Sequence, residues 1–213
     1  MKKKRIYDGR IVQLDDYSLT IEGRKVRREI IKHPGASAIL AFDEKDRIIL
    51  IRQHRFPHGY ILEIPAGTLE KGESPKRCAL REIQEETGYK AKGMTHLITY
   101  YPSVGYNTEA IHCFVASGLT RVKRKLDTDE FITVKKMELP RLIKMIKSGK
   151  IVDSKTICAV MIYAAKKKLD TDEFITVKKM ELTKLLKMIR AGKIIDSKTI
   201  CAAMIYAAKK KLL

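Results

Sequence analysis

The stretch GTLEKGESPKRCALREIQEETGY, residues 67–89, predicts a helix over residues 75–87 that follows a turn-rich loop. Ser74 and Pro75 make a favourable start, because serine caps the first turn of a helix and proline fits within it. Gly88 favours termination of the helix. The spacing of the apolar positions predicts which residues face the core, namely Leu80, Ile83 and Thr87.

Three glutamates of this helix, Glu82, Glu85 and Glu86, are expected on the opposite side and within one turn. Like charges at these spacings repel one another. One interpretation is a solvated, glutamate-rich helix, and the other is a bound cation. Carboxylate oxygens are hard ligands that suit Mg²⁺ or Mn²⁺. Gly67 and Gly72 would allow the preceding loop to bend sharply and bring a backbone carbonyl close to the ion.

The whole stretch fits the pattern G-x5-E-x7-R-E-U-x-E-E-x-G-U, in which U is a bulky aliphatic or aromatic residue. Its defined positions are Gly67, Glu73, Arg81, Glu82, Ile83, Glu85, Glu86, Gly88 and Tyr89. This pattern resembles the Nudix hydrolase box at every defined position, which is far more specific than a lone glycine motif. The resemblance implies a divalent metal site and hydrolysis of a nucleoside diphosphate linked to another group. It implies Glu82 and Glu86 as principal metal ligands and Glu85 as a further ligand or water-orienting residue. Arg81 and Glu73 would form the ion pair that holds the loop to the helix.

The sequence EIPAGTLEKGE around the start of the box is similar to the ADP-ribose pyrophosphatase branch of that family. The resemblance covers roughly residues 5–169. It implies that the backbone carbonyl of Ala66 contributes to the metal site and that Glu63 helps to bind substrate. RREIIKHPGASAIL and LIRQHRFPHGY also resemble the branch, and they suggest Arg27 and Arg55 as contacts to the diphosphate or terminal ribose. Guanidinium groups suit such ligands because they offer paired donors.

One segment departs from the branch. The family often has S-P-G about fifteen residues after the box, whereas this chain has Val104 before Gly105 and a proline at Pro102. Gly105 remains a candidate for substrate binding, but the choice of substrate is less firmly implied. The chain has no Trp to stack on adenine, which leaves tyrosines such as Tyr7 or Tyr17.

The last part of the chain contains an internal repeat. Residues 127–169 and 170–212 align without gaps over 43 residues and differ at seven positions. Each copy predicts a strand, FITVKKMEL in the first, followed by two helices, with Asp153 or Ser154 capping the second helix. We expect one copy to complete the fold and the other to have a structural role on its outside or on a partner.

An acidic loop begins each copy of the repeat. The resemblance implies that an acidic residue beyond the box acts as a base, and Glu130 is favoured over Asp127 and Asp129. The second copy supplies the alternatives Asp170, Asp172 and Glu173. The first copy is preferred because the chain reaches it directly from the strand AIHCFVA.

Short apolar runs separated by turns surround the single helix of the box, and they predict a mixed sheet in an α/β/α sandwich of the Nudix type. Residues 1–34 predict a small lobe of two or three antiparallel strands, residues 35–169 the hydrolase domain, and residues 170–213 the second repeat copy. The resemblance implies a homodimer whose N-terminal strands cross between subunits.

Composition narrows the classes of function. The formal net charge of the 213 residues is +19, which favours anionic ligands such as nucleotides, polyphosphates or nucleic acid. No apolar stretch is long enough for a membrane span or a signal peptide, and four scattered cysteines suggest reduced thiols, so a cytoplasmic location is expected. Abundant Lys, Glu, Arg and Ile lean toward a thermophile source.

The sequence therefore supports three candidate functions. The leading one is Mg²⁺-dependent hydrolysis of ADP-ribose to AMP and ribose 5-phosphate, and another nucleoside diphosphate sugar is the close alternative. A non-catalytic, Nudix-like module that binds nucleotide or RNA is the alternative from a different class. The intact box and the lack of an aromatic-rich RNA motif make nucleic acid the less favoured partner.

Overall fold

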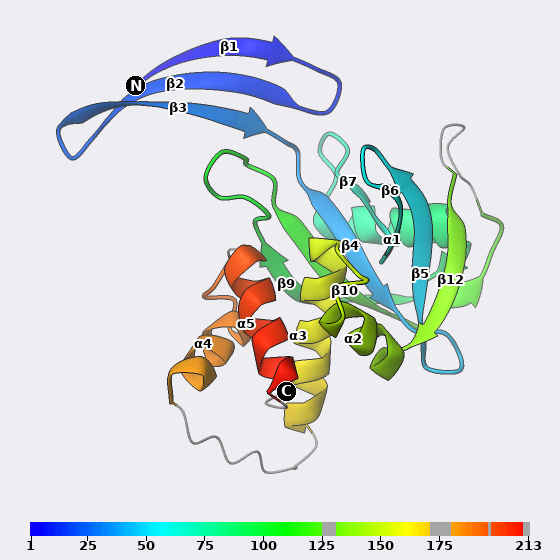
Figure 1. The fold of residues 1–213 in the computed structure, drawn as a ribbon. Helices are drawn as coiled ribbons and strands as arrows, with labels where there is room; N and C mark the ends of the chain where they lie inside the picture. The colour runs from blue at the N-terminus through cyan, green and yellow to red at the C-terminus, as the bar shows by residue number, and fades with distance from the viewer. Residues whose placement is uncertain (125–130, 171–179, 196, 211–213) are drawn as a thin grey trace.

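The N-terminal part is a three-stranded antiparallel sheet that projects from the rest of the molecule (Figure 1). The computed structural model describes residues 1–124, 131–170, 180–195 and 197–210. The strands are β1 (Lys2–Asp8), β2 (Gln13–Ile21) and β3 (Arg24–Lys32). Glu22 and Gly23 join the last two strands with φ of 49° and 77°, the left-handed conformation of a tight hairpin turn. The predicted antiparallel strands are confirmed.

Two further sheets form the centre of the molecule. The first has the order β7-β4-β10-β9, in which β4 and β10 are parallel, and the second has the order β12-β5-β6. Their strands are β4 (Ala36–Ala41), β5 (Arg47–Arg55), β6 (Gly59–Glu63), β7 (Ala66–Thr68), β9 (Gly93–Tyr100), β10 (Ile111–Ser117) and β12 (Thr133–Glu138). A short pair, β8 (Tyr89–Lys90) and β11 (Thr120–Arg121), follows the box helix.

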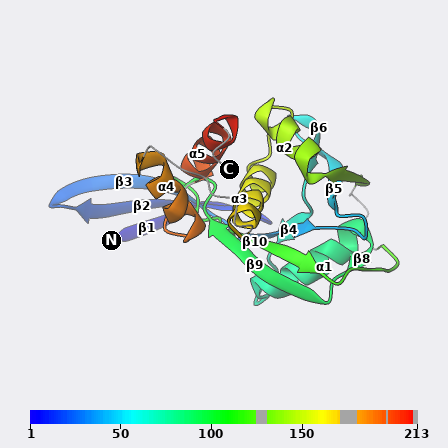
Figure 2. The same ribbon diagram turned by 90° about the horizontal axis from the view of Figure 1, so that it is seen from below.

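Helices cover both faces of these sheets, as Figure 2 shows. Helix α1 (Pro75–Thr87) lies on one side, and α2 (Leu139–Lys147), α3 (Ser154–Asp170) and α5 (Ser197–Lys209) lie on the other. Helix α4 (Met180–Arg190) packs beside α5. The predicted α/β/α sandwich with a mixed sheet is confirmed.

The central strand β4 is apolar at every position except Ser37, because each face of the sheet is buried. In β4, Ala38 and Leu40 join the core under α3, whereas Ile39 and Ala41 join the core under α1. Side chains of a strand alternate between its two faces, so a continuous apolar run is what a strand between two helix layers requires.

The boundaries of α1 agree with the prediction from its capping residues. Ser74 Oγ accepts a hydrogen bond from the backbone N–H of Arg77 at 3.4 Å, and Gly88 ends the helix in the left-handed conformation with φ of 71°. These local signals place the helix that carries the glutamates.

The described part of the first repeat copy, residues 131–169, forms a strand and two helices and supplies an edge strand of the sandwich. Its strand, β12, pairs along the edge of β5, and Asp153 Oδ2 accepts the backbone N–H of Thr156 at 2.9 Å, which caps α3. The second repeat copy folds differently at this point. Its Met180 is the first residue of α4, whereas the repeat predicts the end of a strand there. β5 already pairs with β12 on one side and β6 on the other, so it offers no further edge. The rest of that predicted strand lies outside the described residues.

The second copy packs on the outside of the first. Helix α5 lies against α3, and the equivalent cysteines Cys158 and Cys201 meet with their Sγ atoms 3.4 Å apart. No disulfide bond joins any of the four cysteines. None of the helices in the described ranges is long and apolar enough to cross a membrane.

Candidate functional site

The site is built where the strand β7 lies on the helix α1. Gly67 is pressed against the carboxylate of Glu82 so closely that a Cβ atom at position 67 would overlap Glu82 Oε1. The φ of Gly72 is 78°, so Gly72 provides the expected sharp bend. Gly67 has a different role, because what it provides is room for a carboxylate.

Two of the three box glutamates are buried rather than exposed. Glu82 is 8% exposed and Glu86 is 2% exposed, because the β7 segment covers this side of the helix. Glu86 Oε2 accepts a hydrogen bond from the backbone N–H of Ala66 at 2.9 Å. Both sides of α1 are therefore covered, one by the sheet core and the other by β7, and Leu80, which is predicted to face the core, is only partly buried.

Arg81 links the loop to the helix. Its Nε and Nη2 atoms donate to the two carboxylate oxygens of Glu73 at 3.0 and 2.9 Å, so the expected ion pair is present and bidentate. Its Nη1 donates to Glu82 Oε1 at 2.5 Å and to Glu85 Oε2 at 3.0 Å. The hydrogen bond with Glu73 is the largest cause that raises the pKa of Arg81, and the same bond lowers the pKa of Glu73. The Arg81 guanidinium is therefore a positive charge shared by three carboxylates, those of Glu73, Glu82 and Glu85.

The donor atoms suit a hard divalent ion. The carboxylates of Glu82 and Glu86 and the carbonyl of Ala66 are oxygen donors, as Mg²⁺ and Mn²⁺ prefer. Within the described ranges, however, no three His, Cys, Asp or Glu side chains gather as a metal site. The guanidinium of Arg81 bridges Glu82 and Glu85 instead. The assignment of Ala66, Glu82, Glu85 and Glu86 as ligands stays a prediction.

A second charged cluster borders the same segment. Arg55, the last residue of β5, donates from Nε to Glu63 Oε1 at 2.9 Å. Glu63 is fully buried, and its other oxygen accepts from Lys155 at the start of α3. Glu63 lies three residues before Ala66 in the chain, so the two clusters flank one short stretch of backbone. The structure thus brings together two of the predicted substrate-binding residues.

Comparison with known proteins agrees with this geometry. The NUDIX domain family matches residues 31–159. The chain belongs to the Nudix family.

Two curated relatives illustrate the range of Nudix proteins that this chain resembles. It is 43% identical over 163 residues to the ADP-ribose pyrophosphatase of Bacillus subtilis (strain 168), covering 74% of this chain and 88% of that protein. It is also 43% identical over 165 residues to the methanol dehydrogenase activator of Bacillus methanolicus, covering 75% and 89%. A crystal structure of an ADP compounds hydrolase aligns with a TM-score of 0.69 at 20% identity, over 80% of this chain and 94% of that one. That likeness shows the Nudix fold.

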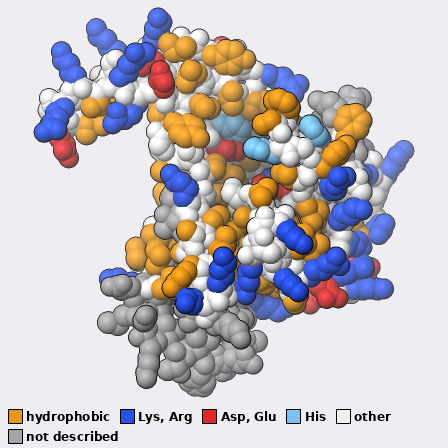
Figure 3. Space-filling model, in the orientation of Figure 1, with side chains coloured by type: hydrophobic (Ala, Val, Ile, Leu, Met, Phe, Trp, Pro, Cys, Tyr) orange, Lys and Arg blue, Asp and Glu red, His pale blue; other side chains and the backbone are white. Residues whose placement is uncertain are grey.

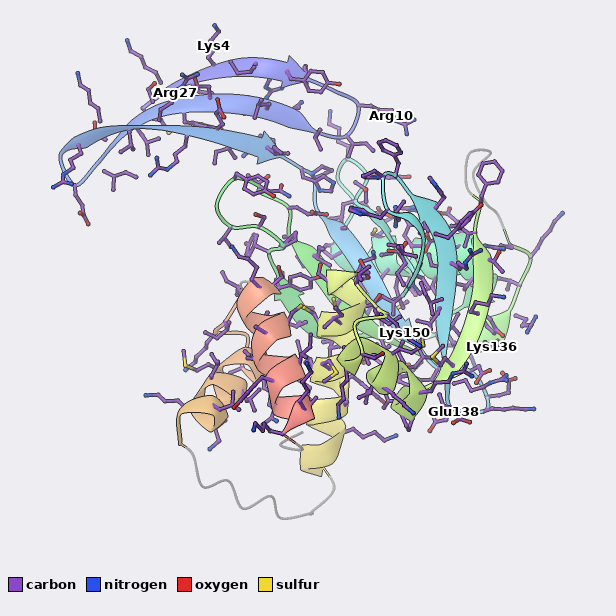
Figure 4. All side chains as sticks on the ribbon, viewed as in Figure 1. Lys4, Arg10, Arg27, Lys136, Glu138 and Lys150 are labelled. Atoms are coloured by element: carbon purple, nitrogen blue, oxygen red, sulfur yellow. The ribbon has the colours of Figure 1, made fainter. Side chains whose placement is uncertain are left out.

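The N-terminal candidates lie away from the Nudix box. Arg27 is on the projecting sheet (Figure 4), where its Nε donates to both carboxylate oxygens of Asp16 at 2.8 Å. Tyr7 is exposed on the same sheet, and the Tyr17 hydroxyl donates to Asp15 at 3.4 Å. Figure 3 shows Lys and Arg side chains along this sheet and over one side of the body. Within one chain, these residues are not brought to α1.

The remaining candidates are on loops. Gly105 lies in the loop after β9, where a Cβ atom would meet nothing within 4 Å, so its position is open. This loop is tied to the end of β3 by the Ile31 N–H, which donates to the Tyr106 carbonyl at 2.7 Å. The candidate base Glu130 and its neighbours Asp127 and Asp129 lie outside the described residues, as do Asp172 and Glu173, and the side chain of Asp170 is not described.

Sequence reasoning did not identify Lys155 and Thr156 as neighbours of the site. Thr156 Oγ1 accepts the backbone N–H of Ile64 at 2.9 Å, and Lys155 binds Glu63. The only local signal is the helix start Asp-Ser-Lys-Thr, and the same Asp-Ser-Lys-Thr also begins the equivalent helix of the second copy. The sequence therefore gives no indication of which copy contacts the box.

Proposed function

We propose that this Nudix protein hydrolyses the diphosphate bond of ADP-ribose, giving AMP and ribose 5-phosphate, with Mg²⁺ or Mn²⁺ bound at Glu82, Glu86 and the Ala66 carbonyl. The main structural support is the pair of buried carboxylates, Glu82 and Glu86, which α1 holds against Ala66 and Gly67. The chain is also 43% identical to the ADP-ribose pyrophosphatase of Bacillus subtilis. The carboxylate oxygens of Glu82 and Glu86 and the carbonyl oxygen of Ala66 are hard donors of the kind that Mg²⁺ and Mn²⁺ prefer.

The bound ion would supply charge neutralisation of the diphosphate and a more acidic attacking water. The residues of the chain hold the carboxylates and the phosphate-binding group in place. The Ala66 N–H fixes one oxygen of Glu86, and Arg81 fixes Glu82 and Glu85. The Arg55 side chain is partly exposed, and its guanidinium group suits a phosphate. We further propose Glu130 as the base that accepts the proton of the attacking water.

The proposed active form is a homodimer in which the projecting sheet of one chain reaches the site of the other. The sheet carries exposed apolar side chains, namely Ile6, Tyr7, Ile11, Val12 and Ile21, which a partner could cover. A crossing sheet would also give Arg27 and Tyr7 access to a site that they do not reach within one chain. Light scattering should give twice the mass of one chain, and a monomer at all concentrations would contradict this arrangement.

Hydrolysis of ADP-ribose by the full chain with Mg²⁺ tests the function. Glu86→Gln keeps the shape of the side chain but removes its charge, and we expect kcat to fall at least ~100-fold, the scale for losing a group that stabilises developing charge. Glu44→Gln, an exposed glutamate in the turn before β5, is the control and should leave kcat unchanged.

Equal turnover by wild type and Glu86→Gln would remove the assigned site. If wild type cleaves GDP-mannose or another nucleoside diphosphate sugar much faster than ADP-ribose, the chemistry stands and the substrate assignment is wrong. Salt-sensitive binding of RNA without turnover would favour a binding module.

A further inference from the structure

The backbone between β6 and β7 is held from two sides. On one side, Glu86 of α1 accepts the N–H of Ala66 at 2.9 Å. On the other side, Thr156 of α3 accepts the N–H of Ile64 at 2.9 Å. The first turn of α3 therefore takes part in placing the residues that precede the box, although it lies 92 positions away from Ile64 in the sequence.

A network of hydrogen bonds fixes this first turn. Asp153 Oδ2 accepts from the backbone N–H of Thr156 at 2.9 Å and from its hydroxyl at 2.6 Å. Asp153 Oδ1 accepts from Lys155 Nζ at 2.8 Å. The ammonium group of Lys155 is thus held between two carboxylates, those of Asp153 and Glu63, and its side chain is only 12% exposed.

Glu63 connects Lys155 to the surface. One oxygen of its buried carboxylate accepts from Lys155, and the other accepts from Arg55 Nε at 2.9 Å. The Arg55 side chain is 42% exposed, and its terminal amino groups form no hydrogen bond with the described part of the chain. Arg55 is therefore anchored through Nε while its side chain is partly exposed, and a guanidinium held in this way keeps further N–H donors that suit a phosphate.

The charges of this network balance. Two carboxylates, Glu63 and Asp153, face two cations, Arg55 and Lys155. Burial alone would lower the pKa of Lys155, but the carboxylates of Asp153 and Glu63 outweigh it and raise that pKa above its ordinary value. The lysine stays charged at neutral pH, so loss of its charge would leave a net negative cluster beside an anionic substrate.

The second repeat copy shows that position, not local sequence, creates this role. Lys198 is the counterpart of Lys155 in an identical Ser-Lys-Thr-Ile-Cys-Ala run, yet it is exposed. Its neighbour Ser197 donates instead to the Pro102 carbonyl at 2.8 Å, in the loop that carries Gly105. The chain therefore contains a matched internal control for Lys155.

We propose that Lys155 is a positioning residue for substrate binding: through Glu63, it holds the guanidinium of Arg55 in the orientation that receives the diphosphate. This inference rests on the proposed function. Lys155 does not itself touch substrate, and its contribution is to keep Glu63 in place and to offset its charge.

The first test compares Lys155→Met, Lys155→Arg and Lys198→Met in ADP-ribose hydrolysis by the full chain. Lys155→Met should raise KM about tenfold or more with a smaller change in kcat, the scale for residues that orient contacting groups. Lys155→Arg keeps the charge and should restore most of the affinity, and Lys198→Met should match wild type. A folded Lys155→Met enzyme with wild-type KM would overturn the proposal.

The second test separates positioning from simple stabilisation. If Lys155 acts through Arg55, then Lys155→Met should change KM little once Arg55→Ala is already present. Full additivity of the two substitutions would overturn the proposal. Turnover by wild type and Lys198→Met reports on the proposed function independently of Lys155.

A further variant covers the case in which Lys155→Met does not fold. Glu63→Gln combined with Lys155→Met removes both charges of the buried pair, so it should fold, as thermal melting would show. Its KM should remain raised because Arg55 has lost its carboxylate anchor. A wild-type KM in this double variant would overturn the proposal.

Discussion

The two copies of the repeat have nearly the same sequence and very different surroundings. The copy at residues 127–169 supplies the edge strand β12 and the helix start that binds Glu63. In the copy at residues 170–212, Asp170 is the last residue of α3, helix α4 begins at Met180, and helix α5 packs on α3. Their first helices share one buried position, Ile146 in α2 and its counterpart Ile189 in α4. They differ at the neighbouring positions, because Leu142 is buried while its counterpart Leu185 is only partly buried, and Leu186 is buried while its counterpart Ile143 is only partly buried. Available partners, rather than local sequence, decide what each copy becomes.

The largest expected difference concerns the counterparts Leu142 and Leu185. Leu142 is fully buried, so Leu142→Ala should lower the free energy of unfolding by about 3 kcal/mol through the cavity that it leaves. Leu185 is only partly buried, and Leu185→Ala should cost about 1 kcal/mol. Urea unfolding of both variants measures this, and equal losses would show that the copies are packed alike.

A smaller effect should come from the ion pair that β12 makes with the turn before β5. Lys136 Nζ lies 2.9 Å from Asp43 Oδ2, and Lys136 is on β12 (Figure 4). Burial opposes ionisation of Asp43, but hydrogen bonds from Arg47 and Lys136 outweigh it and hold the Asp43 pKa well below its usual range. Lys136→Met should lower the free energy of unfolding by about 1 kcal/mol at pH 7.

The stabilisation from this ion pair should depend on pH. Because the folded pKa of Asp43 is depressed, its stabilisation is present above the unfolded pKa of about 4 and is lost as pH falls toward the lower folded value. Unfolding experiments from pH 7 to pH 2 should show the deficit of Lys136→Met shrinking at the acidic end. The exposed Lys150→Met is the control, and a pH-independent deficit would mean that Asp43 is not the partner that matters.

The smallest expected effect on activity is that of joining the two copies covalently. The Cys158 and Cys201 Sγ atoms are 3.4 Å apart, so diamide should oxidise them to a disulfide within one chain. The hydrogen bond with Cys201 and burial raise the pKa of Cys158, so the reaction should be slow and favoured at alkaline pH. Mass spectrometry should show the loss of two hydrogen atoms with turnover retained.

Cys201→Ser should block this cross-link and serves as the control. A disulfide between two chains, visible as a covalent dimer on a non-reducing gel, would contradict the packing of α5 on α3 of the same chain.

Much of the fold could be predicted because its signals are local. Ser74, Pro75 and Gly88 set the ends of α1, and continuous apolar runs identified strands covered on both faces. The resemblance to the Nudix box likewise implied the contact between Glu73 and Arg81. These features depend on residues close together in the chain or on a fixed helical period.

The other features of the fold and of the site depend on contacts between residues far apart in the chain, which sequence spacing does not encode. Glu82 and Glu86 are buried because β7 covers them, and no pattern within the helix indicates that cover. Lys155 meets Glu63 across 92 positions, and Lys198 carries the same local sequence without that contact. Met180 begins α4 although its counterpart Met137 lies in β12, and β5, the partner of β12, is already paired on both sides.

The meeting of Cys158 with its own counterpart Cys201 places a contact between like surfaces inside a single polypeptide. Such self-complementary contacts ordinarily join separate subunits and weaken on dilution. Tethering the two surfaces replaces bulk concentration by a fixed effective concentration, so this helix pair should persist in solutions too dilute for assembly.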